Sequence, residues 1–234
     1  MGVDPTRRPA HACQPDAMHG PKTIHLVRHG QSELNASVPT DGPETARLTA
    51  IGERQAQAIA ASFDHAPELI VVSSFRRARE TAAATHARFP GARLEVWPVE
   101  EFHYLGATAY RGTTKRDRRP DVAAYWQACD PAYVGESGAE SFVAFLARVQ
   151  SVRERLERAP ERRIAVFSHK KLLHALMWSW REGPPAADRE GMARFRTYDR
   201  GEAFPNGSCV EVVLTGGVAR VGDPRAHALP EDAA

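Results

Sequence analysis

The chain has 234 residues, a length that fits one domain of ordinary size or one domain carrying a sizeable insertion. Hydrophobic residues make up 42% of it and charged residues 26%, and the net charge of +2 comes from basic residues spread along the chain. This distribution argues against a basic nucleic-acid-binding tail. No stretch approaches the roughly 18–20 apolar residues of a membrane span. We therefore expect neither a nucleic-acid nor a membrane partner.

The N-terminal segment 1–22 mixes Pro, His, Asp and Arg and lacks the apolar centre of a secretory signal, so we expect a flexible extension there. The 3 cysteines, Cys13, Cys129 and Cys209, lack metal-ligand spacing and are odd in number. Such usage favours free thiols in a reducing compartment. We predict a cytoplasmic protein that is a monomer or a homodimer.

Short apolar runs alternate with amphipathic ones along most of the chain. The run 23–28 (TIHLVR) is β-branched and apolar and is followed by Gly30, which predicts a buried strand and a tight turn. After the polar loop 37–43, Thr49 has the position of a helix N-cap. The later predicted elements are a strand at 68–72, a helix at 76–88, a strand at 94–97, a helical piece at 122–128, a helix from a capping box of Ser137 and Glu140 to Leu156, a strand at 163–168, a helix at 170–180, and a hairpin of 209–214 and 218–221.

This alternation predicts an α/β fold, a three-layer α/β/α sandwich around a mostly parallel central sheet with an antiparallel C-terminal strand. The domain is expected to span 23–222 and to be followed by a tail at 223–234. Within it, the stretch 98–138 has a different character, because it is rich in tyrosine and basic residues and poor in regular pattern. We expect this stretch to be a lid-like insertion over the active site.

Two histidines directly follow two predicted strands: His29 after 23–28 and His169 after 163–168. Ligands of open α/β sheets collect at the carboxyl ends of strands, so both imidazoles are expected to face one crevice. Arg28 adds a permanent cation whose planar fork of donors suits phosphate oxygens, and Arg77 can add another. Each residue alone is more often structural, but the combination indicates a phosphate site.

The run Arg28-His29-Gly30, with Ser32 and Asn35, resembles the signature of the histidine phosphatase superfamily, the phosphoglycerate-mutase-like proteins. Further blocks follow in the order of that family, so that the resemblance covers roughly 23–221. These blocks are Leu48-Thr49 with Gly52 and Gln55-Ala56, Ser73 with Arg77-Ala78 and Thr81-Ala82, Gly138 to Ser141 with Arg148, Ser168-His169, and Pro205 to Ser208.

The resemblance implies a histidine acid-type phosphatase, free of metal and cofactor, that hydrolyses a small phosphorylated metabolite. His29 would attack phosphorus and become a phosphohistidine, which water then hydrolyses. An imidazole with the ordinary pKa of about 6.5 is uncharged near neutral pH and can act as this nucleophile. Arg28, Arg77 and His169 would surround the phosphoryl oxygens, with Asn35 as a neutral donor.

The leaving oxygen needs a proton, and Glu101 best matches the acid of the family. Burial could raise the pKa of a carboxyl at that position, so that it serves as acid and later as base toward water. Glu100 is the rival and His103 a more distant one. In an extended segment the two glutamates point to opposite sides, so only one of them faces the pocket.

One departure concerns the residue after the second histidine. The family usually has Gly or another small or polar residue there, whereas this chain has Lys170-Lys171. Lys170 could reach a substrate carboxylate or second phosphate, or it could point to solvent. Tyr104 and Tyr110 could line the pocket mouth or pack within the lid. The basic run 111–119 could bind an anionic substrate, although a solvated loop is its default interpretation.

Other phosphatase chemistries leave marks that are absent here: no Cys precedes an Arg by six positions, and no Asp-x-Asp pair or Gly-rich Lys-Ser/Thr loop occurs. Two alternatives stay open. One is a phosphotransferase of the phosphoglycerate mutase type, whose substrate loops the insertion resembles poorly. The other is a non-catalytic binding or regulatory member of the fold, which usually lacks one of the central residues. The sequence leaves the substrate itself open.

Overall fold

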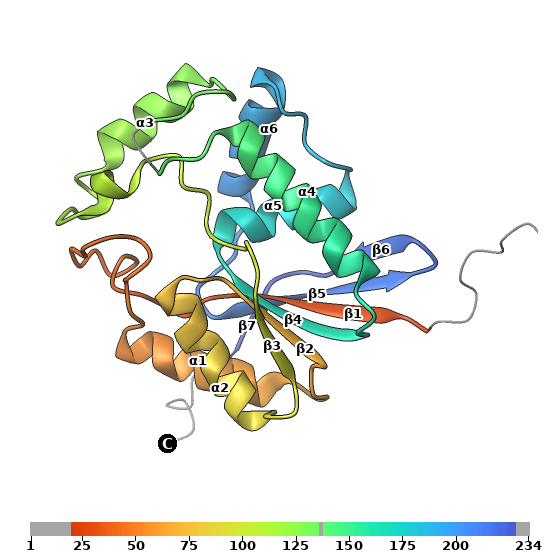
Figure 1. Ribbon diagram of the computed structural model, residues 1–234. Helices are drawn as coiled ribbons and strands as arrows, with labels where there is room; N and C mark the ends of the chain where they lie inside the picture. The colour runs from red at the N-terminus through yellow and green to blue at the C-terminus, as the bar shows by residue number, and fades with distance from the viewer. Residues whose placement is uncertain (1–19, 136–137, 228–234) are drawn as a thin grey trace, which may run out of the picture.

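A computed structural model of the chain describes residues 20–135 and 138–227. Its centre is a seven-stranded sheet in the order β3-β2-β4-β1-β5-β6, with β7 paired to β5 (Figure 1). Strands β1 to β4 pair with one another in parallel. Strand β5 pairs antiparallel with β1, β6 and β7. The strands are β1 (Lys22–Arg28), β2 (Leu69–Val72), β3 (Arg93–Val96), β4 (Arg163–Ser168), β5 (Ser208–Thr215), β6 (Val218–Val221) and β7 (Arg225–Ala226).

Helices cover both faces of this sheet, which confirms the predicted three-layer sandwich (Figure 1). Two helices lie on one face and three on the other, while one helix and a 3₁₀ turn belong to the segment between β3 and the fourth helix. On the first face lie α1 (Ala50–Ser62) and α2 (Arg76–Arg88); on the second lie α4 (Phe142–Arg158), α5 (Lys170–Arg181) and α6 (Arg189–Gly201); the intervening segment holds η1 (Ala107–Tyr110) and α3 (Arg119–Ala128).

The central strands are buried on both sides, which explains why they read as continuous apolar runs. In β1, Leu26 belongs to the core cluster shared with α4 and α5, whereas the next residue, Val27, belongs to the cluster shared with α1 and α2. The same alternation holds in β4, where Val166 and Phe167 belong to opposite clusters. The two cores therefore fix the register of the strands whose ends carry the site.

Two helices differ from the prediction. The amphipathic helix α4 begins at Phe142, later than the capping box implied: Ser141 is its N-cap and accepts from the N–H of Ala144 at 3.1 Å, while Ser137 lies outside the described residues. The helix α6 was not predicted. Met192 and Phe195 are its fully buried apolar residues, and Asp188 caps it by accepting from the N–H of Gly191 at 2.8 Å, a start signal that the sequence contains.

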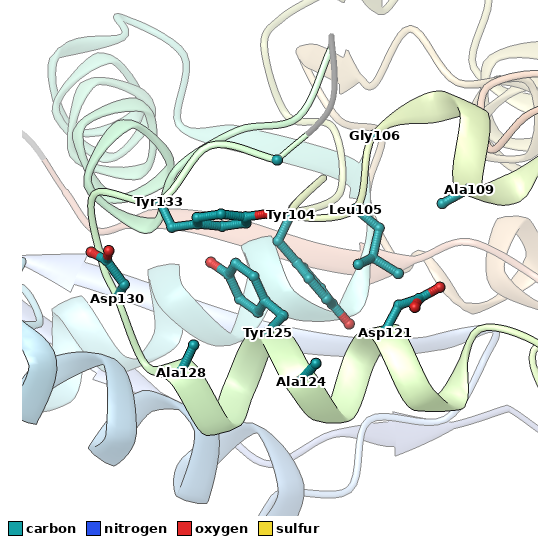
Figure 2. A pocket seen from close by; sticks show the side chains of 11 residues that line it. Tyr104, Leu105, Gly106, Ala109, Asp121, Ala124, Tyr125, Ala128, Asp130 and Tyr133 are labelled. Carbon is teal, nitrogen blue, oxygen red and sulfur yellow. The ribbon is translucent and has the colours of Figure 1, made fainter.

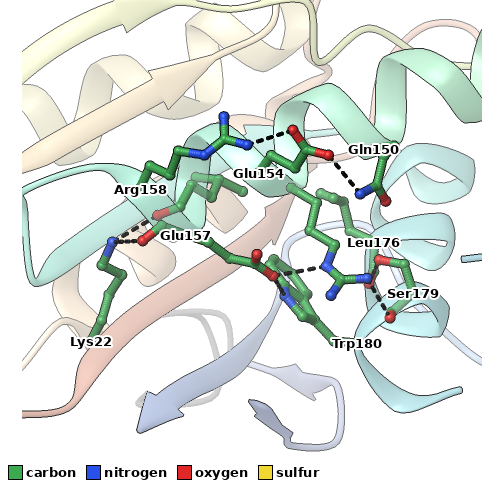
Figure 3. Close-up of polar contacts among 10 residues, drawn as sticks. Lys22, Gln150, Glu154, Glu157, Arg158, Leu176, Ser179 and Trp180 are labelled. Atoms are coloured by element: carbon green, nitrogen blue, oxygen red, sulfur yellow. Dashed lines mark hydrogen bonds and ion pairs between the residues drawn. The ribbon is translucent and has the colours of Figure 1, made fainter. Parts of the chain in front are cut away.

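The start of β1 is tied to the far end of α4 by a single ammonium group. Lys22 Nζ donates to the carbonyl oxygens of Leu156, Glu157 and Ala159 at 2.6–2.8 Å and so satisfies the free carbonyls at the C-terminus of α4 (Figure 3). The carboxylate of Glu157 in turn accepts from Trp180 Nε1 on α5 at 2.8 Å. The helix layer over β1 and β4 is thereby joined to the sheet.

The turn after β1 packs closely against the start of α1. A Cβ on Gly52 would lie 2.0 Å from the carbonyl oxygen of Gln31, and one on Gly30 would lie 2.5 Å from the carbonyl oxygen of Gly52. Only glycine allows this approach at either position. The helix start therefore supports the turn that carries His29.

The insertion reaches back to the loop after β1. Thr40 forms an isolated bridge with Arg111, and Gly112 N donates to the Thr40 carbonyl at 2.9 Å. Within the described ranges, no helix is long and apolar enough to cross a bilayer. The proposed extension at 1–22, apart from residues 20–22, and the end of the tail beyond residue 227 lie outside the described residues, as does Cys13.

Candidate active site

Three neighbouring strands end side by side and supply the centre of the site. His29 follows β1 and its N–H donates to the carbonyl of Ser168, the last residue of β4, at 3.0 Å. Ser73 follows β2 and its N–H donates to the carbonyl of Phe167 at 3.1 Å. The side chains of His29, Ser73 and His169 thus start from one edge of the sheet, as expected for ligand sites in open α/β folds.

Arg77, in the first turn of α2, joins the two imidazoles. Its Nε donates to His29 Nε2 at 3.1 Å and its Nη2 donates to His169 Nδ1 at 3.0 Å. The third donor, Nη1, bonds the carbonyl of Pro43 in the loop after β1. Arg77 and His29 are each 4% exposed, and the two imidazole centroids lie 5.1 Å apart. The structure therefore brings together the two predicted histidines and the predicted arginine.

These contacts define the tautomer of His29. Because Arg77 donates to Nε2, that nitrogen carries a lone pair, and the proton is on Nδ1, which donates to the Gly30 carbonyl at 2.7 Å. Nε2 is thus the nitrogen that faces the cluster of donors. Gly30 N is held in turn by Thr81 Oγ1 at 3.1 Å, so the turn around His29 is anchored from α2.

His169 has the opposite arrangement. Its Nδ1 accepts from Arg77, so the proton is on Nε2, which donates to Ser73 Oγ at 2.8 Å. Ser73 Oγ also accepts from the N–H of Phe75 at 3.2 Å. Although Ser73 belongs to one of the sequence motifs, it was not predicted as a site residue. Its position directly after β2 was the feature of the sequence that could have indicated this role.

Both histidines are held uncharged. Burial lowers the pKa of His29 well below 6.5, and the nearby charges of Arg77 and Arg28 lower it further. Burial and the charge of Arg77 do the same to the pKa of His169. Burial also lowers the pKa of Arg77 to about 10, against the opposing effect of the Glu101 carboxylate, so this guanidinium stays charged at neutral pH.

Arg28, at the end of β1, is the second cation of the site. Its Nη1 donates to the carbonyl of Phe204, and its Nε is buried with no acceptor among the described residues. Burial lowers the pKa of Arg28, while the charge of Glu101 raises it. A buried guanidinium donor without an acceptor suits an anionic ligand better than an apolar one.

Asn35 lies on the exposed side of the cluster. Its Oδ1 accepts from Ser32 N, Ser32 Oγ and Asn206 Nδ2 at 2.8–3.1 Å, which leaves its own amide N–H groups available to a ligand. Asn206 also donates to the His29 carbonyl at 3.1 Å. Asn206 was not predicted as a site residue, although the motif Pro205 to Ser208 pointed to its neighbourhood.

The two glutamates after β3 differ in their surroundings, although both line one open hollow of about 360 Å³ together with His103. Glu101 Oε1 accepts from the N–H of Phe102 at 3.1 Å and from the N–H of Lys171 at 3.0 Å, at the start of α5. Glu100 Oε1 accepts from Ser74 N at 3.1 Å. The charge of Glu101 raises the pKa of both Arg28 and Arg77. Glu101 therefore lies near enough to both arginines for its charge to act on them.

The two lysines at the start of α5 also differ. Lys170 Nζ donates to the Asp199 carbonyl of α6 at 2.6 Å and lies 3.8 Å from its Oδ1. Lys171 is partly buried, and its Nζ lies 5.8 Å from the ring centroid of Tyr104. The lysine predicted to reach a ligand is therefore held by α6, and its neighbour faces the insertion.

Tyr104 packs within the insertion, stacked on Tyr125 with ring centroids 4.5 Å apart. Both rings line a cavity of about 460 Å³ between α3 and the segment that leads to η1, with Tyr133 across from them (Figure 2). Tyr110 is covered by the guanidinium of Arg118 at 4.4 Å from its ring centroid. Tyr104 therefore packs within the insertion and lines this cavity, whereas Tyr110 lies near enough to the site to act on the pKa of Arg77.

The basic run 111–119 lies on the surface of the insertion. Lys115, Arg116 and Arg119 are exposed, whereas Arg118 is buried against Tyr110 and donates to the Thr113 carbonyl at 2.8 Å. Most of the run therefore matches the interpretation as a charged, solvated loop.

Comparisons with known proteins identify the family and the fold of the chain. The sequence matches the model of the Histidine phosphatase superfamily (branch 1) over residues 24–197. Over 161 residues, 67% of this chain, it is 30% identical to 6-phosphofructo-2-kinase/fructose-2,6-bisphosphatase from Caenorhabditis elegans, of which it spans only 34%. Its fold is similar to that of the α-ribazole phosphatase from Shigella flexneri, with a TM-score of 0.68 and 23% identity over 88% of this chain and 98% of that one. It is also similar to a mycobacterial glucosyl-3-phosphoglycerate phosphatase, with a TM-score of 0.64 and 24% identity over 89% and 100% of the two chains.

Proposed function

Because the chain belongs to the histidine phosphatase superfamily, we propose that it hydrolyses a small phosphomonoester through a phosphohistidine on His29. The observation that carries this proposal is the placement of Arg77, whose guanidinium bonds His29 Nε2 and His169 Nδ1 together. A cation so placed meets the oxygens of a phosphoryl group at the moment when the imidazole attacks its phosphorus.

In the first step, the hydrogen bond from Arg77 Nε to His29 Nε2 breaks, and the freed lone pair of Nε2 forms the P–N bond while the P–O bond to the alcohol breaks. The imidazole becomes cationic, and its Nδ1–H remains on the Gly30 carbonyl, a favourable acceptor for that charge. The leaving oxygen takes a proton from Glu101. The Oε1 atom of this carboxyl is held by two N–H groups, which leaves Oε2 to carry the proton.

In the second step, water attacks the phosphohistidine. The carboxylate of Glu101 takes a proton from the water, the new P–O bond forms, and the P–N bond breaks. Inorganic phosphate leaves, and His29 returns to the neutral tautomer with its proton on Nδ1. Arg28 and Arg77 hold the non-bridging oxygens in both steps, with Asn35 as a neutral donor and His169 positioning Arg77. We propose no metal requirement, because these cations supply the charge that a metal would.

A screen of phosphomonoesters tests the proposal. The purified chain is incubated with p-nitrophenyl phosphate and a panel that includes the two compounds named in its structural neighbours, α-ribazole 5′-phosphate and glucosyl-3-phosphoglycerate, and released phosphate is measured from pH 5 to 8. His29→Ala is the blank. Rapid quench with ³²P-labelled substrate should trap label that is stable to alkali and labile to acid. Activity that survives in His29→Ala overturns the nucleophile assignment.

The two alternatives give different outcomes in the same assays. A phosphotransferase of the mutase type would convert 3-phosphoglycerate into its isomer in the presence of a bisphosphate, whereas a phosphatase releases free phosphate. A non-catalytic member would release no phosphate at any pH. Two observations argue against this alternative: Arg77 donates to both histidines, and the charge of Glu101 raises the pKa of both Arg28 and Arg77. We also propose a cytoplasmic location, which the localisation of the protein in cells would test. We further propose the histidine acid-type class, which the pH profile of phosphate release would test.

A further inference from the structure

The first turn of α5 contains two lysines where helices favour acids. The N-terminus of a helix carries a partial positive charge, so an ammonium there is unfavourable and an anion is favourable. α5 has no acidic residue in its first turn, and its N-cap, His169, makes no capping bond through its side chain. Departures from local preference concentrate at functional sites, which makes Lys170 and Lys171 candidates for an anion-binding role.

The two lysines differ in the partners of their ammonium groups. The ammonium of Lys170 already has an acceptor, the Asp199 carbonyl. The ammonium of Lys171, in contrast, has no hydrogen-bond acceptor and no ion-pair partner among the described residues, and it lies over the ring of Tyr104, 5.8 Å from the ring centroid. A partly buried ammonium that makes a cation–π contact and leaves its three donors unused is prepared for an anion.

The backbone places Lys171 beside the reaction. Its N–H donates to Glu101 Oε1 at 3.0 Å, so its Cα lies next to the carboxyl that we propose as the proton donor. Burial acts to lower the pKa of Lys171, but the charge of Glu101, together with Tyr104 and Asp199, outweighs burial and raises it. The ammonium is therefore charged at every pH at which a phosphatase is assayed.

Glu101 protonates the leaving oxygen, so the alcohol part of the substrate must lie beside Glu101 and on the side away from His29. We infer that Lys171 binds a second anionic group, a carboxylate or a second phosphate, on that alcohol. The substrate class is thus phosphomonoesters of acidic alcohols. This inference rests on the proposed function and adds to it the chemistry of the leaving group.

A different role for Lys171, as the counter-ion of Glu101 alone, makes a different prediction. Its removal would then affect all substrates equally, because every leaving oxygen needs the same proton. Anion binding affects only ligands that carry the second charge. Matched pairs of ligands separate the two roles: 3-phosphoglycerate against glycerol 3-phosphate tests a carboxylate, and fructose 1,6-bisphosphate against fructose 6-phosphate tests a second phosphate.

The experiment measures the inhibition constants of these four compounds against hydrolysis of p-nitrophenyl phosphate, at fixed ionic strength. In the wild-type chain, the more acidic member of at least one pair should bind about 10- to 100-fold more tightly, the range for hydrogen bonds to charged groups. Lys171→Met should bring that ratio close to 1. Lys171→Arg keeps the cation and should retain the preference. Lys170→Met removes the same charge from the same helical turn and should leave the ratio unchanged.

The inference is overturned by wild-type ratios near 1 in both pairs, by an equal loss for both members in Lys171→Met, or by a ratio that Lys170→Met abolishes. Failure of the proposed function is a separate result, namely no hydrolysis of p-nitrophenyl phosphate by the wild-type chain. In that case titration calorimetry with the same four compounds still gives the two ratios of dissociation constants, which decide whether Lys171 selects an anion. Thermal melts of each variant show whether it is folded.

Discussion

Ser73 fixes the orientation of His169: its hydroxyl oxygen accepts the Nε2–H of the imidazole at 2.8 Å, in a fully buried contact. Because this bond places the proton on Nε2, the other ring nitrogen is free to accept from Arg77. A serine that touches neither phosphate nor leaving group in the proposed mechanism thus determines how the central guanidinium is held.

Ser73→Ala should therefore lower kcat by about 10- to 100-fold, the usual effect of removing an orienting partner in an active site. It should also lower the free energy of unfolding by about 1–3 kcal/mol, because it leaves a buried N–H unsatisfied. Steady-state kinetics and urea unfolding measure the two effects. Ser74→Ala, at the exposed neighbouring position, is the control. An unchanged kcat in Ser73→Ala would show that Arg77 is positioned without the serine.

Arg77→Lys should lower kcat/KM by about 10²- to 10³-fold, the range for loss of a donor to developing negative charge. A lysine keeps the charge but cannot present the planar fork that contacts both imidazoles and the Pro43 carbonyl. Arg79→Lys, on the exposed side of α2, should leave kcat/KM unchanged. A small effect at Arg77 would mean that charge alone is sufficient there.

The stability of the chain should fall as the pH falls below about 6.5. The pKa values of His29 and His169 are well below 6.5 in the folded chain, so between those values and 6.5 only the unfolded chain takes up protons. Each histidine then contributes a loss of up to about 1.4 kcal/mol per pH unit. Above pH 6.5 this contribution is fully present. Urea midpoints from pH 7.5 to 5 measure the slope, which should be shallower in His169→Gln. A slope that His169→Gln leaves unchanged would place the proton uptake elsewhere.

Activity should be insensitive to chelators. In the proposed mechanism, Arg28 and Arg77 meet the negative charge of the phosphoryl group, and the charges of both guanidinium groups already act on His29. After dialysis against EDTA, kcat for p-nitrophenyl phosphate should stay within about twofold of its starting value, a change of less than about 0.5 kcal/mol in barrier height. A loss of activity that Mg²⁺ restores would contradict this expectation.

Gly52→Ala should destabilise the chain by about 1–3 kcal/mol, the usual range for overpacking. The new methyl group would lie 2.0 Å from the Gln31 carbonyl oxygen, and relief of this clash must move either α1 or the turn that carries His29. Gly91→Ala has nothing within 4 Å of the new methyl group and should change the free energy of unfolding by less than about 0.5 kcal/mol. Thermal melts of both variants, with kcat measured alongside, make the comparison.

The parallel core of this fold was predictable from the sequence, because strands such as β2 and β4 are covered on both faces and therefore read as unbroken apolar runs. The helix α6 was not predicted: it packs against α5 and fully buries few apolar residues. The strand ends also predicted where His29 and His169 would meet. Which lysine of α5 faces Glu101 could not be predicted, because neighbouring residues of a helix point about 100° apart and the phase depends on where the helix starts.

Asn206 illustrates a second reason why part of the site could not be predicted from the sequence. It reaches His29 only because β5 pairs beside β1, an association between residues far apart in the sequence that no local pattern encodes. The assignment of roles to Glu101, Asn35 and Tyr104 stays a prediction.

The contacts of His29 with this distant segment also set an order of assembly. The carbonyl of His29 accepts from Asn206 Nδ2 and from the N–H of Gly207, both at 3.1 Å. Because a chain is synthesised from its N-terminus, the histidine that we propose as nucleophile emerges from the ribosome long before the segment that supplies these two hydrogen bonds. In a nascent or truncated chain that stops before residue 206, the turn around His29 would keep its contacts with α1 and α2 but lack these two hydrogen bonds, so its support is completed late in the synthesis of the domain.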